Sequence, residues 1–299
     1  MFNNILIIGC GLIGSSILRG SFVRKISKNI FVHEKSKKNI SFIKKINKKT
    51  KFLDELDIQI SKMDLIILCT HMSQYDGIIK KLQKFTSSKN IITDTGSTKC
   101  NIINLINRNK KIKDIFIPSH PIAGSEVSGP KHGNKDLFKN KWCIVLNNKN
   151  KIKLKKVEYF WKKLGSKIIL MNAVEHDKIF SITSHMPHLI AYNLVKTAID
   201  FQKKSKKNII KYSAGGLRDF SRTAASNEIM WRDIFFNNKN NIIQSINIFV
   251  KNLNNFKKLI NKKNNKEIIK ILKNSKRVRK QIIDLKQDIS TPNFGRDIF

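Results

Sequence analysis

A short apolar run that leads directly into paired glycines is the feature that most restricts how this chain can fold. Residues 5–8 read Ile-Leu-Ile-Ile, and Gly-Cys-Gly-Leu-Ile-Gly follows at residues 9–14. A strand, a glycine turn and a helix in this order bring backbone close to a pyrophosphate, whose charge the helix N-terminus attracts. The residues predicted to bind a dinucleotide through this turn are Gly9, Gly11, Leu12, Ile13 and Gly14.

An acidic residue ends the second apolar run. Glu34 follows residues 30–33 and comes about 20 residues after Gly14, the spacing of the acid that binds a ribose 2′-hydroxyl. A carboxylate there also repels a 2′-phosphate, so we expect NAD as the cofactor. Tolerance of NADP stays open, because three lysines follow at once: Lys35, Lys37 and Lys38.

Apolar runs alternate with polar helical stretches through the first half of the chain. The predicted strands are residues 5–8, 30–33, 65–70, 91–94, 115–118, 142–147 and 167–171. The first four are almost continuously apolar, which indicates a parallel sheet covered on both faces. Ligands bind at the carboxyl ends of such strands, where Thr70 is predicted to contact the cofactor.

Strand patterns stop after Met171 and long helical periodicities replace them. We therefore predict an α/β fold: a Rossmann-type doubly wound sheet in residues 1–171, followed by an all-helical dimerisation domain in residues 172–299. Apolar residues between Ile242 and Ile260 recur at spacings of three and four, on one helical face. We expect this face to form a homodimer, although packing against the N-terminal domain remains an alternative.

The net charge of +38 raises the question of nucleic-acid binding. A nucleic-acid surface needs basic residues clustered on one face, preferably arginines interleaved with aromatic rings. Here the excess is mostly lysine, spread among asparagine and isoleucine along the whole chain. We therefore expect no nucleic-acid partner; the positive surface would attract anionic substrates and cofactors instead.

The apolar runs are too short for an export signal or a membrane span, so we expect a cytoplasmic protein without membrane contact. The four cysteines lack metal-type spacing, and disulfides are not expected in that compartment. His185 and His188 share a helical face, but no third ligand lies at suitable spacing, so no metal site is predicted.

Polar motifs follow the strands of the first half. Ser97 lies in Asp-Thr-Gly-Ser-Thr-Lys after the fourth run, and His120 lies in Ser-His-Pro-Ile-Ala-Gly-Ser-Glu after the fifth. Both would project at the carboxyl edge of the sheet, near the nicotinamide end of a cofactor. A histidine there, beside a turn and a carboxylate, is a candidate general base.

Two arginines, an aspartate and paired glycines gather in the second half. Gly-Gly-Leu-Arg-Asp-Phe-Ser-Arg spans residues 215–222, and Met-Trp-Arg-Asp spans residues 230–233. Arginine forks bind carboxylates bidentately, and glycines let backbone approach a ligand. This pattern favours a site for a carboxylate substrate over a solvated helix end.

These motifs, in this order, resemble the prephenate dehydrogenase family, which includes the arogenate and cyclohexadienyl dehydrogenases of tyrosine biosynthesis. The resemblance covers nearly the whole chain, including a tail at residues 287–296. It implies NAD-dependent oxidative decarboxylation of prephenate to 4-hydroxyphenylpyruvate, with the arogenate or dual-specificity reaction as the alternative. No carboxylate follows Glu126 before Asp136, which favours prephenate over the amine-bearing arogenate.

The resemblance also implies roles for single residues. His120 would accept the proton of the ring hydroxyl, and Ser97 would hold that hydroxyl or orient His120. Arg222 would bind a substrate carboxylate, with Arg218 and Arg232 as weaker candidates that could pair with carboxylates of the protein. The other residues predicted to line the substrate site are Ser125, Glu126, His188, Gly215, Asp219 and Trp231.

Two other classes of protein would be expected to carry different sequence motifs. Another two-domain hydroxy-acid dehydrogenase would place a catalytic lysine in a glycine- or asparagine-flanked motif of the helical half, and neither Lys178 nor Lys196 lies in one. A nucleic-acid-binding function on a Rossmann scaffold would not explain why Ser97, His120 and Arg222 occur where they do.

Overall fold

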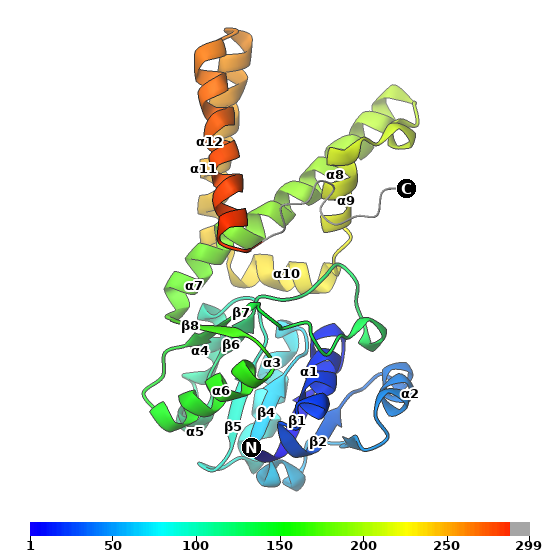
Figure 1. Cartoon of the computed structure of the whole chain (residues 1–299), viewed down its shortest axis with the longest axis vertical. Helices are drawn as coiled ribbons and strands as arrows, with labels where there is room; N and C mark the ends of the chain where they lie inside the picture. The colour runs from blue at the N-terminus through cyan, green and yellow to red at the C-terminus, as the bar shows by residue number, and fades with distance from the viewer. Residues whose placement is uncertain (288–299) are drawn as a thin grey trace. The chain divides into compact units, whose positions relative to one another are not determined.

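The chain alternates between strands and helices as far as residue 171 and is mainly helical from there to residue 287 (Figure 1). The computed structural model describes residues 1–287, so the tail noted above lies outside the described residues except for Gln287. Two compact units are present, Met1–Ile242 and Ile243–Phe299. The predicted change from strands to helices after Met171 is confirmed.

Five parallel strands form the central sheet of the first unit, in the order β3-β2-β1-β4-β5. They are β1 (Phe2–Ile8), β2 (Ser27–His33), β3 (Lys51–Phe52), β4 (Leu65–Leu68) and β5 (Ile91–Asp94). The order runs outward from β1 in both directions, so the topological switch point, where open α/β sheets bind ligands, lies at the carboxyl ends of β1 and β4. The short β3 was not predicted.

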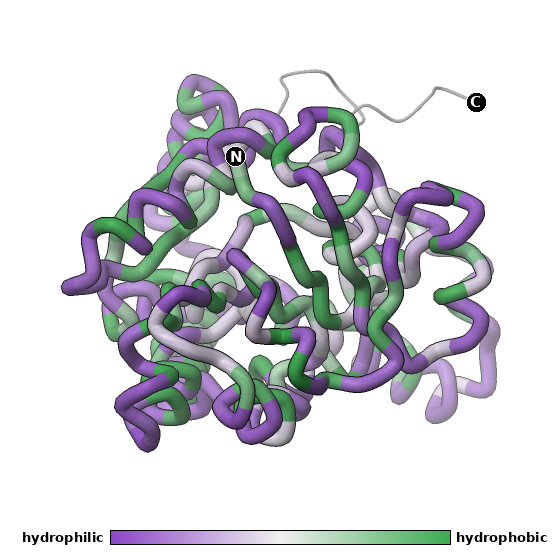
Figure 2. Tube along the Cα trace, turned by 90° about the horizontal axis from the view of Figure 1, so that it is seen from below, coloured by the Kyte–Doolittle hydropathy of each residue, from purple (hydrophilic) through white to green (hydrophobic). Residues whose placement is uncertain are grey.

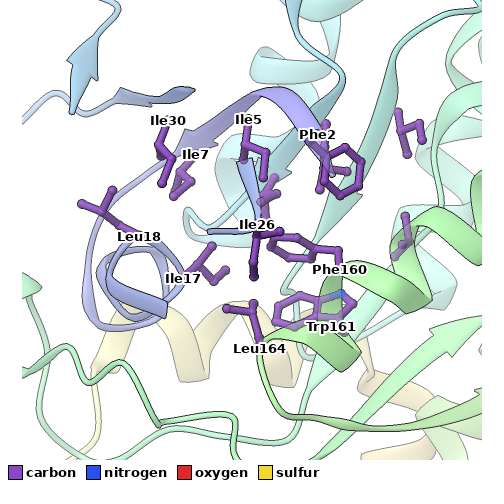
Figure 3. Close-up of a cluster of buried hydrophobic side chains, with 14 of the residues drawn as sticks. Phe2, Ile5, Ile7, Ile17, Leu18, Ile26, Ile30, Phe160, Trp161 and Leu164 are labelled. Carbon is purple, nitrogen blue, oxygen red and sulfur yellow. The ribbon is translucent and has the colours of Figure 1, made fainter. Parts of the chain in front are cut away.

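Helices bury both faces of this sheet, as the continuous apolar runs predict. Ile5 and Ile7 share a buried cluster with Ile17 of α1 (Leu12–Val23) and with Phe160 and Trp161 of α6 (Lys151–Lys163), and Figure 3 shows the side chains of this cluster gathered around Ile26. The alternate residues of β1, Leu6 and Ile8, pack in a second cluster. That cluster includes residues of three helices: α3 (Tyr75–Phe85), α4 (Cys100–Ile106) and α5 (Lys110–Ile115). The remaining helix of this half is α2 (Lys37–Ile46).

A second sheet of three strands has the order β6-β7-β8, with β6 antiparallel to β7. Its strands are β6 (Ser119–Pro121), β7 (Trp142–Leu146) and β8 (Lys167–Met171). The predicted strand at residues 115–118 is wrong, because Ile115 ends α5 and only Phe116 bridges to β5. The Asn109 side chain accepts the Ile112 N–H at 3.1 Å and caps that helix, which turns Ile112 and Ile115 into the core.

Between residues 173 and 287 the structure is mainly helical. The α-helices are α7 (Ala173–Phe180), α8 (Met186–Ser205), α9 (Gly215–Thr223), α10 (Glu228–Asn237), α11 (Lys239–Asn261) and α12 (Asn265–Asp284). A π-turn, η4 (Ser181–His185), joins α7 to α8. The 3₁₀ turns are η1 (Ile58–Lys62), η2 (Met72–Gln74), η3 (Pro130–His132) and η5 (Ile209–Tyr212).

The second unit contains most of α11 and all of α12. Large apolar side chains on both helices are exposed, among them Leu253, Ile260, Leu272 and Val278. Within residues 1–287, no helix combines the length and apolarity that a bilayer span requires. In Figure 2 hydrophilic stretches recur along the coloured part of the trace, in keeping with the even spread of lysine in the sequence.

Candidate active site

The predicted cofactor turn forms a cradle between β1 and α1. Gly9 has φ +85°, and a Cβ atom on it would meet Thr70 Cγ2 at 2.6 Å. A Cβ atom on Gly14 would collide with the Gly9 carbonyl oxygen. Around Gly11, the N-cap of α1, the space is open and no side chain caps the helix. Open space beside uncapped N–H groups suits a diphosphate, so the cradle fits a dinucleotide.

The other predicted cofactor residues lie around this cradle. Leu12 and Ile13 begin α1, whose first N–H groups have no partner inside the helix. Glu34 is half-buried; its Oε2 accepts the Cys10 N–H at 2.8 Å and its Oε1 accepts the Ser36 N–H at 2.9 Å. The carboxylate is therefore fixed at the edge of the turn, where an acid can accept a ribose hydroxyl.

One buried carboxylate ties together the segments that carry Ser97 and His120. Asp94 Oδ2 accepts the N–H of Gly96 at 3.0 Å, and Asp94 Oδ1 accepts the N–H of Ser119 at 3.0 Å. Each donor immediately precedes one of the two predicted catalytic residues. The structure thus brings the two segments together at the carboxyl edge of β5.

His120 is buried and its ring contacts a second histidine, His176 of α7. His120 Nδ1 lies 2.9 Å from His176 Nε2, and His176 Nδ1 donates to Asp177 Oδ1 at 2.8 Å. Burial lowers the pKa of His120 well below its usual value, and the neighbouring His176 and Lys99 lower it further. A neutral imidazole at neutral pH can act as a general base.

A third buried histidine lies beside the Ser97 backbone. Asn238 Nδ2 donates to His185 Nδ1 at 3.1 Å and to the Asp177 carbonyl oxygen at 2.7 Å. His185 Nδ1 is therefore an acceptor, which leaves the proton on Nε2. Burial lowers the pKa of His185 to about 4, while the adjacent Ser97 carbonyl acts in the opposite direction.

Arg222 reaches the loop that follows His120. Its Nη1 lies 3.5 Å from Glu126 Oε2, and the arginine side chain is 56% exposed. Ser125 precedes Glu126 in this loop, and Asp219 lies one turn before Arg222 on α9. The guanidinium group is thus accessible to a carboxylate ligand while a protein carboxylate holds it at the surface.

The rings of His188, near the N-terminal end of α8, and of Trp231, near the N-terminal end of α10, stack on each other. Their ring centroids are 3.8 Å apart with an interplanar angle of 22°, and Trp231 is buried. His188 Nδ1 donates to the Ser184 carbonyl oxygen at 3.1 Å, so Nε2 is the nitrogen that can accept from a ligand. Gly215 begins α9, where a Cβ atom would meet no neighbour within 4 Å.

Some residues that organise this site were given no role from the sequence. The Asp177 carboxylate accepts the N–H groups of Lys99 at 2.7 Å and Cys100 at 2.9 Å. Asp233 accepts the Ser73 N–H at 2.9 Å and pairs with Arg232 at 2.7 Å, as considered for that arginine. Only His176 and Asp177, two adjacent polar residues in the first helix after the last strand, gave a signal that could have marked them.

Similarity to known proteins extends over nearly the whole chain. Residues 20–170 match the family described as prephenate dehydrogenase, nucleotide-binding domain, and residues 172–274 match prephenate dehydrogenase, dimerization domain. A cyclohexadienyl dehydrogenase of Zymomonas mobilis is 30% identical over 93% of this chain and 96% of that protein. A prephenate dehydrogenase of Lactococcus lactis is 31% identical, covering 97% of this chain and 80% of that protein.

A solved structure is similar to this chain in both sequence and fold. Prephenate dehydrogenase from A. aeolicus, in complex with hydroxyphenyl propionate and NAD+, superposes with a TM-score of 0.87. It is 31% identical to this chain, and the match covers 94% of this chain and 99% of that one.

Proposed function

Because the chain belongs to the prephenate dehydrogenase family, we propose that it catalyses the NAD-dependent oxidative decarboxylation of prephenate to 4-hydroxyphenylpyruvate. The observation that carries the proposal is His120, a buried imidazole with a lowered pKa, tied through Asp94 to the loop of Ser97. This arrangement suits removal of a proton from a hydroxyl group beside the nicotinamide.

NAD is the cofactor that the cradle favours. The space over Gly11 suits the diphosphate, and the half-buried Glu34 carboxylate suits a ribose 2′-hydroxyl while repelling a 2′-phosphate. The A. aeolicus relative in complex with NAD+ supports the same choice. When bound, NAD would supply the acceptor for the hydride that leaves the ring carbon carrying the hydroxyl.

His120 and Ser97 act on that hydroxyl. His120 Nδ1 faces His176, so the proton moves from the hydroxyl oxygen to His120 Nε2 as the carbon–oxygen bond gains double-bond character. The bond to the ring carboxylate then breaks, and its electron pair enters the ring as carbon dioxide leaves. The aromatic product is a phenolate that takes its proton back.

Positive charge and stacked rings hold the remainder of the substrate. Arg222 binds a substrate carboxylate, and Glu126 orients the guanidinium group. His188, stacked on Trp231, offers Nε2 to the substrate. Ser125, Gly215 and Asp219 complete the predicted lining.

A cyclohexadienyl dehydrogenase, which acts on arogenate as well, is the second candidate. The Zymomonas mobilis relative with that name favours it. Glu126 is the carboxylate that an arogenate amine would approach, and no other acid follows it before Asp136. That sparse acidity supports prephenate as the better substrate.

A homodimer formed through residues 172–299 is part of this proposal, with a domain boundary near residues 171–172. The match of residues 172–274 to a dimerization domain supports it, as do the exposed apolar side chains Leu253 and Leu272. Sedimentation equilibrium should give twice the chain mass, and Leu253→Glu with Leu272→Glu should give the monomer.

The test of the reaction is NADH formation with prephenate and with arogenate, each tried with NAD and NADP. We expect the largest kcat/KM for prephenate with NAD. Folded protein that binds NAD but turns over neither substrate would contradict the assignment. Comparable turnover of both substrates would make the second candidate correct, and turnover of arogenate alone would make the protein an arogenate dehydrogenase.

A further inference from the structure

His120 ends a chain of hydrogen bonds that begins on a fixed carboxylate. Asp177 is held by the backbone N–H groups of Lys99 and Cys100 at 2.7 and 2.9 Å. Its Oδ1 accepts His176 Nδ1 at 2.8 Å, and His176 Nε2 lies 2.9 Å from His120 Nδ1. All three side chains are buried.

The order of donors along this chain follows from Asp177. Burial alone would raise the pKa of Asp177, but bonds from His176, Cys100 and Lys99 lower it, so the carboxylate is ionised and only accepts. His176 must then carry a proton on Nδ1 and present a lone pair on Nε2. His120 donates to that lone pair from Nδ1, so its own lone pair lies on Nε2.

The charged groups around the two histidines disfavour an additional proton on His120. His120 is affected by His176, Lys99 and His185, each of which lowers its pKa in addition to burial. His176 faces Lys99 as well, but it also faces Asp177 and Asp94, which raise its pKa. A positive charge in this cluster is therefore most stable on the ring that contacts Asp177.

We propose that, in the reaction proposed above, His176 and Asp177 position His120 with its lone pair on Nε2 and share the proton it receives. When the substrate hydroxyl gives its proton to His120 Nε2, the Nδ1 proton moves to His176 Nε2. The resulting imidazolium of His176 lies against Asp177. This inference depends on the proposed function for the identity of the proton donor only.

The proton balance of the reaction suits a buried relay. Prephenate loses a hydride and carbon dioxide, and the product phenol keeps the proton that the hydroxyl had at the start. The relay therefore holds one proton and returns it, and no exit to solvent is required. His120 and His176 also pack on Phe180, with ring centroids 5.2 and 4.5 Å away, which excludes water from the pair.

The test is the pH profile of kcat/KM for His176→Gln. The glutamine oxygen can accept from His120 Nδ1 but cannot take its proton, so the orientation is kept and charge sharing is lost. We expect kcat to fall at least about tenfold, with KM for prephenate within about twofold. The acidic limb should move to lower pH, because the added proton must then stay on His120 and its charge can no longer pass to a ring that contacts Asp177.

A matched control lies on the same helix. The Asn172 side chain caps α7 by accepting the Glu175 N–H at 2.9 Å and is not a member of the proposed relay. Asn172→Ala should lower the melting temperature while the acidic limb stays in place. A folded His176→Gln enzyme with the wild-type kcat and the wild-type acidic limb would overturn the proposal, as would a limb that moves equally in Asn172→Ala.

A measurement without substrate separates this proposal from the reaction itself. Imidazole ¹⁵N NMR of the free protein should show the proton on Nδ1 of both His120 and His176. Its titration should give a lower pKa for His120 in Asp177→Asn than in wild type. A proton on Nε2 of wild-type His120 would overturn the relay even if the enzyme oxidises prephenate. If the protein gives the expected spectrum but does not oxidise prephenate, the relay stands and only the proposed substrate is contradicted.

Discussion

Lys99 Nζ lies 2.6 Å from Asp94 Oδ2, and neither side chain is exposed to solvent. The same carboxylate binds the N–H groups of Gly96 and Ser119, and the Lys99 N–H binds Asp177. The ion pair therefore connects the predicted catalytic residues to each other and to the relay. A buried pair of this kind stabilises the arrangement only while both partners are present.

Removal of one member of the Lys99–Asp94 ion pair should destabilise the fold. We expect Lys99→Met to lower the free energy of unfolding by about 3–5 kcal/mol, because Asp94 is left as an uncompensated buried charge. Urea unfolding measures this loss. The double variant Lys99→Met, Asp94→Asn should be less destabilised than the sum of the two single variants. Strict additivity would mean that the two groups do not interact.

His120→Asn tests the base. The asparagine cannot accept a proton, so kcat for prephenate should fall about 10²–10⁴-fold, with a modest change in KM. Binding of NAD, followed by fluorescence titration, should stay as in wild type. A kcat close to that of wild type would remove His120 from this role.

Arg222→Gln tests the carboxylate site. We expect KM for prephenate to rise at least about tenfold while NAD affinity stays constant, because a charge-assisted contact made in the ground state is lost. Arg218→Gln is the matched control, since it removes the same charge from the same helix, one turn earlier. A larger rise in KM for Arg218→Gln would transfer the carboxylate role to Arg218.

The sequence predicted those parts of the fold that depend on local patterns. The glycine turn, Glu34 and the buried parallel strands follow from spacing and apolar periodicity over a few residues. The strand at 115–118 was misplaced because a short apolar run such as Ile115-Phe116 fits a buried strand and the buried face of a helix equally well. Only the Asn109 cap and pairing with β7 settle the boundary.

The hydrogen bonds of the site could not be predicted in the same way. His120 and His176 are 56 residues apart, and Ser73 and Asp233 are 160 apart. No local pattern indicates such pairs, because they form only when α7 and α10 pack against the loops of the sheet. The motif residues were therefore visible in the sequence, but the contacts that orient them were not.

Acid should destabilise the unit Met1–Ile242 through its buried histidines. Burial lowers the pKa of His185 to about 4, and its Nδ1 must stay unprotonated to accept from Asn238. An unfolded chain takes up this proton near pH 6.5, so the unfolded state binds more protons between about pH 6.5 and 4. This contribution to stability is present above that window and is lost as the pH falls through it.

The loss should be measurable by urea unfolding at two pH values. Between about pH 7 and pH 5, His185 alone should lower the free energy of unfolding by about 2 kcal/mol. Burial also lowers the pKa values of His120 and His176, so they add to the loss in the same direction. His185→Asn keeps an acceptor for Asn238 but cannot be protonated, so its stability should fall less between the two pH values. An equal fall in this variant and in wild type would show that His185 does not cause the acid sensitivity.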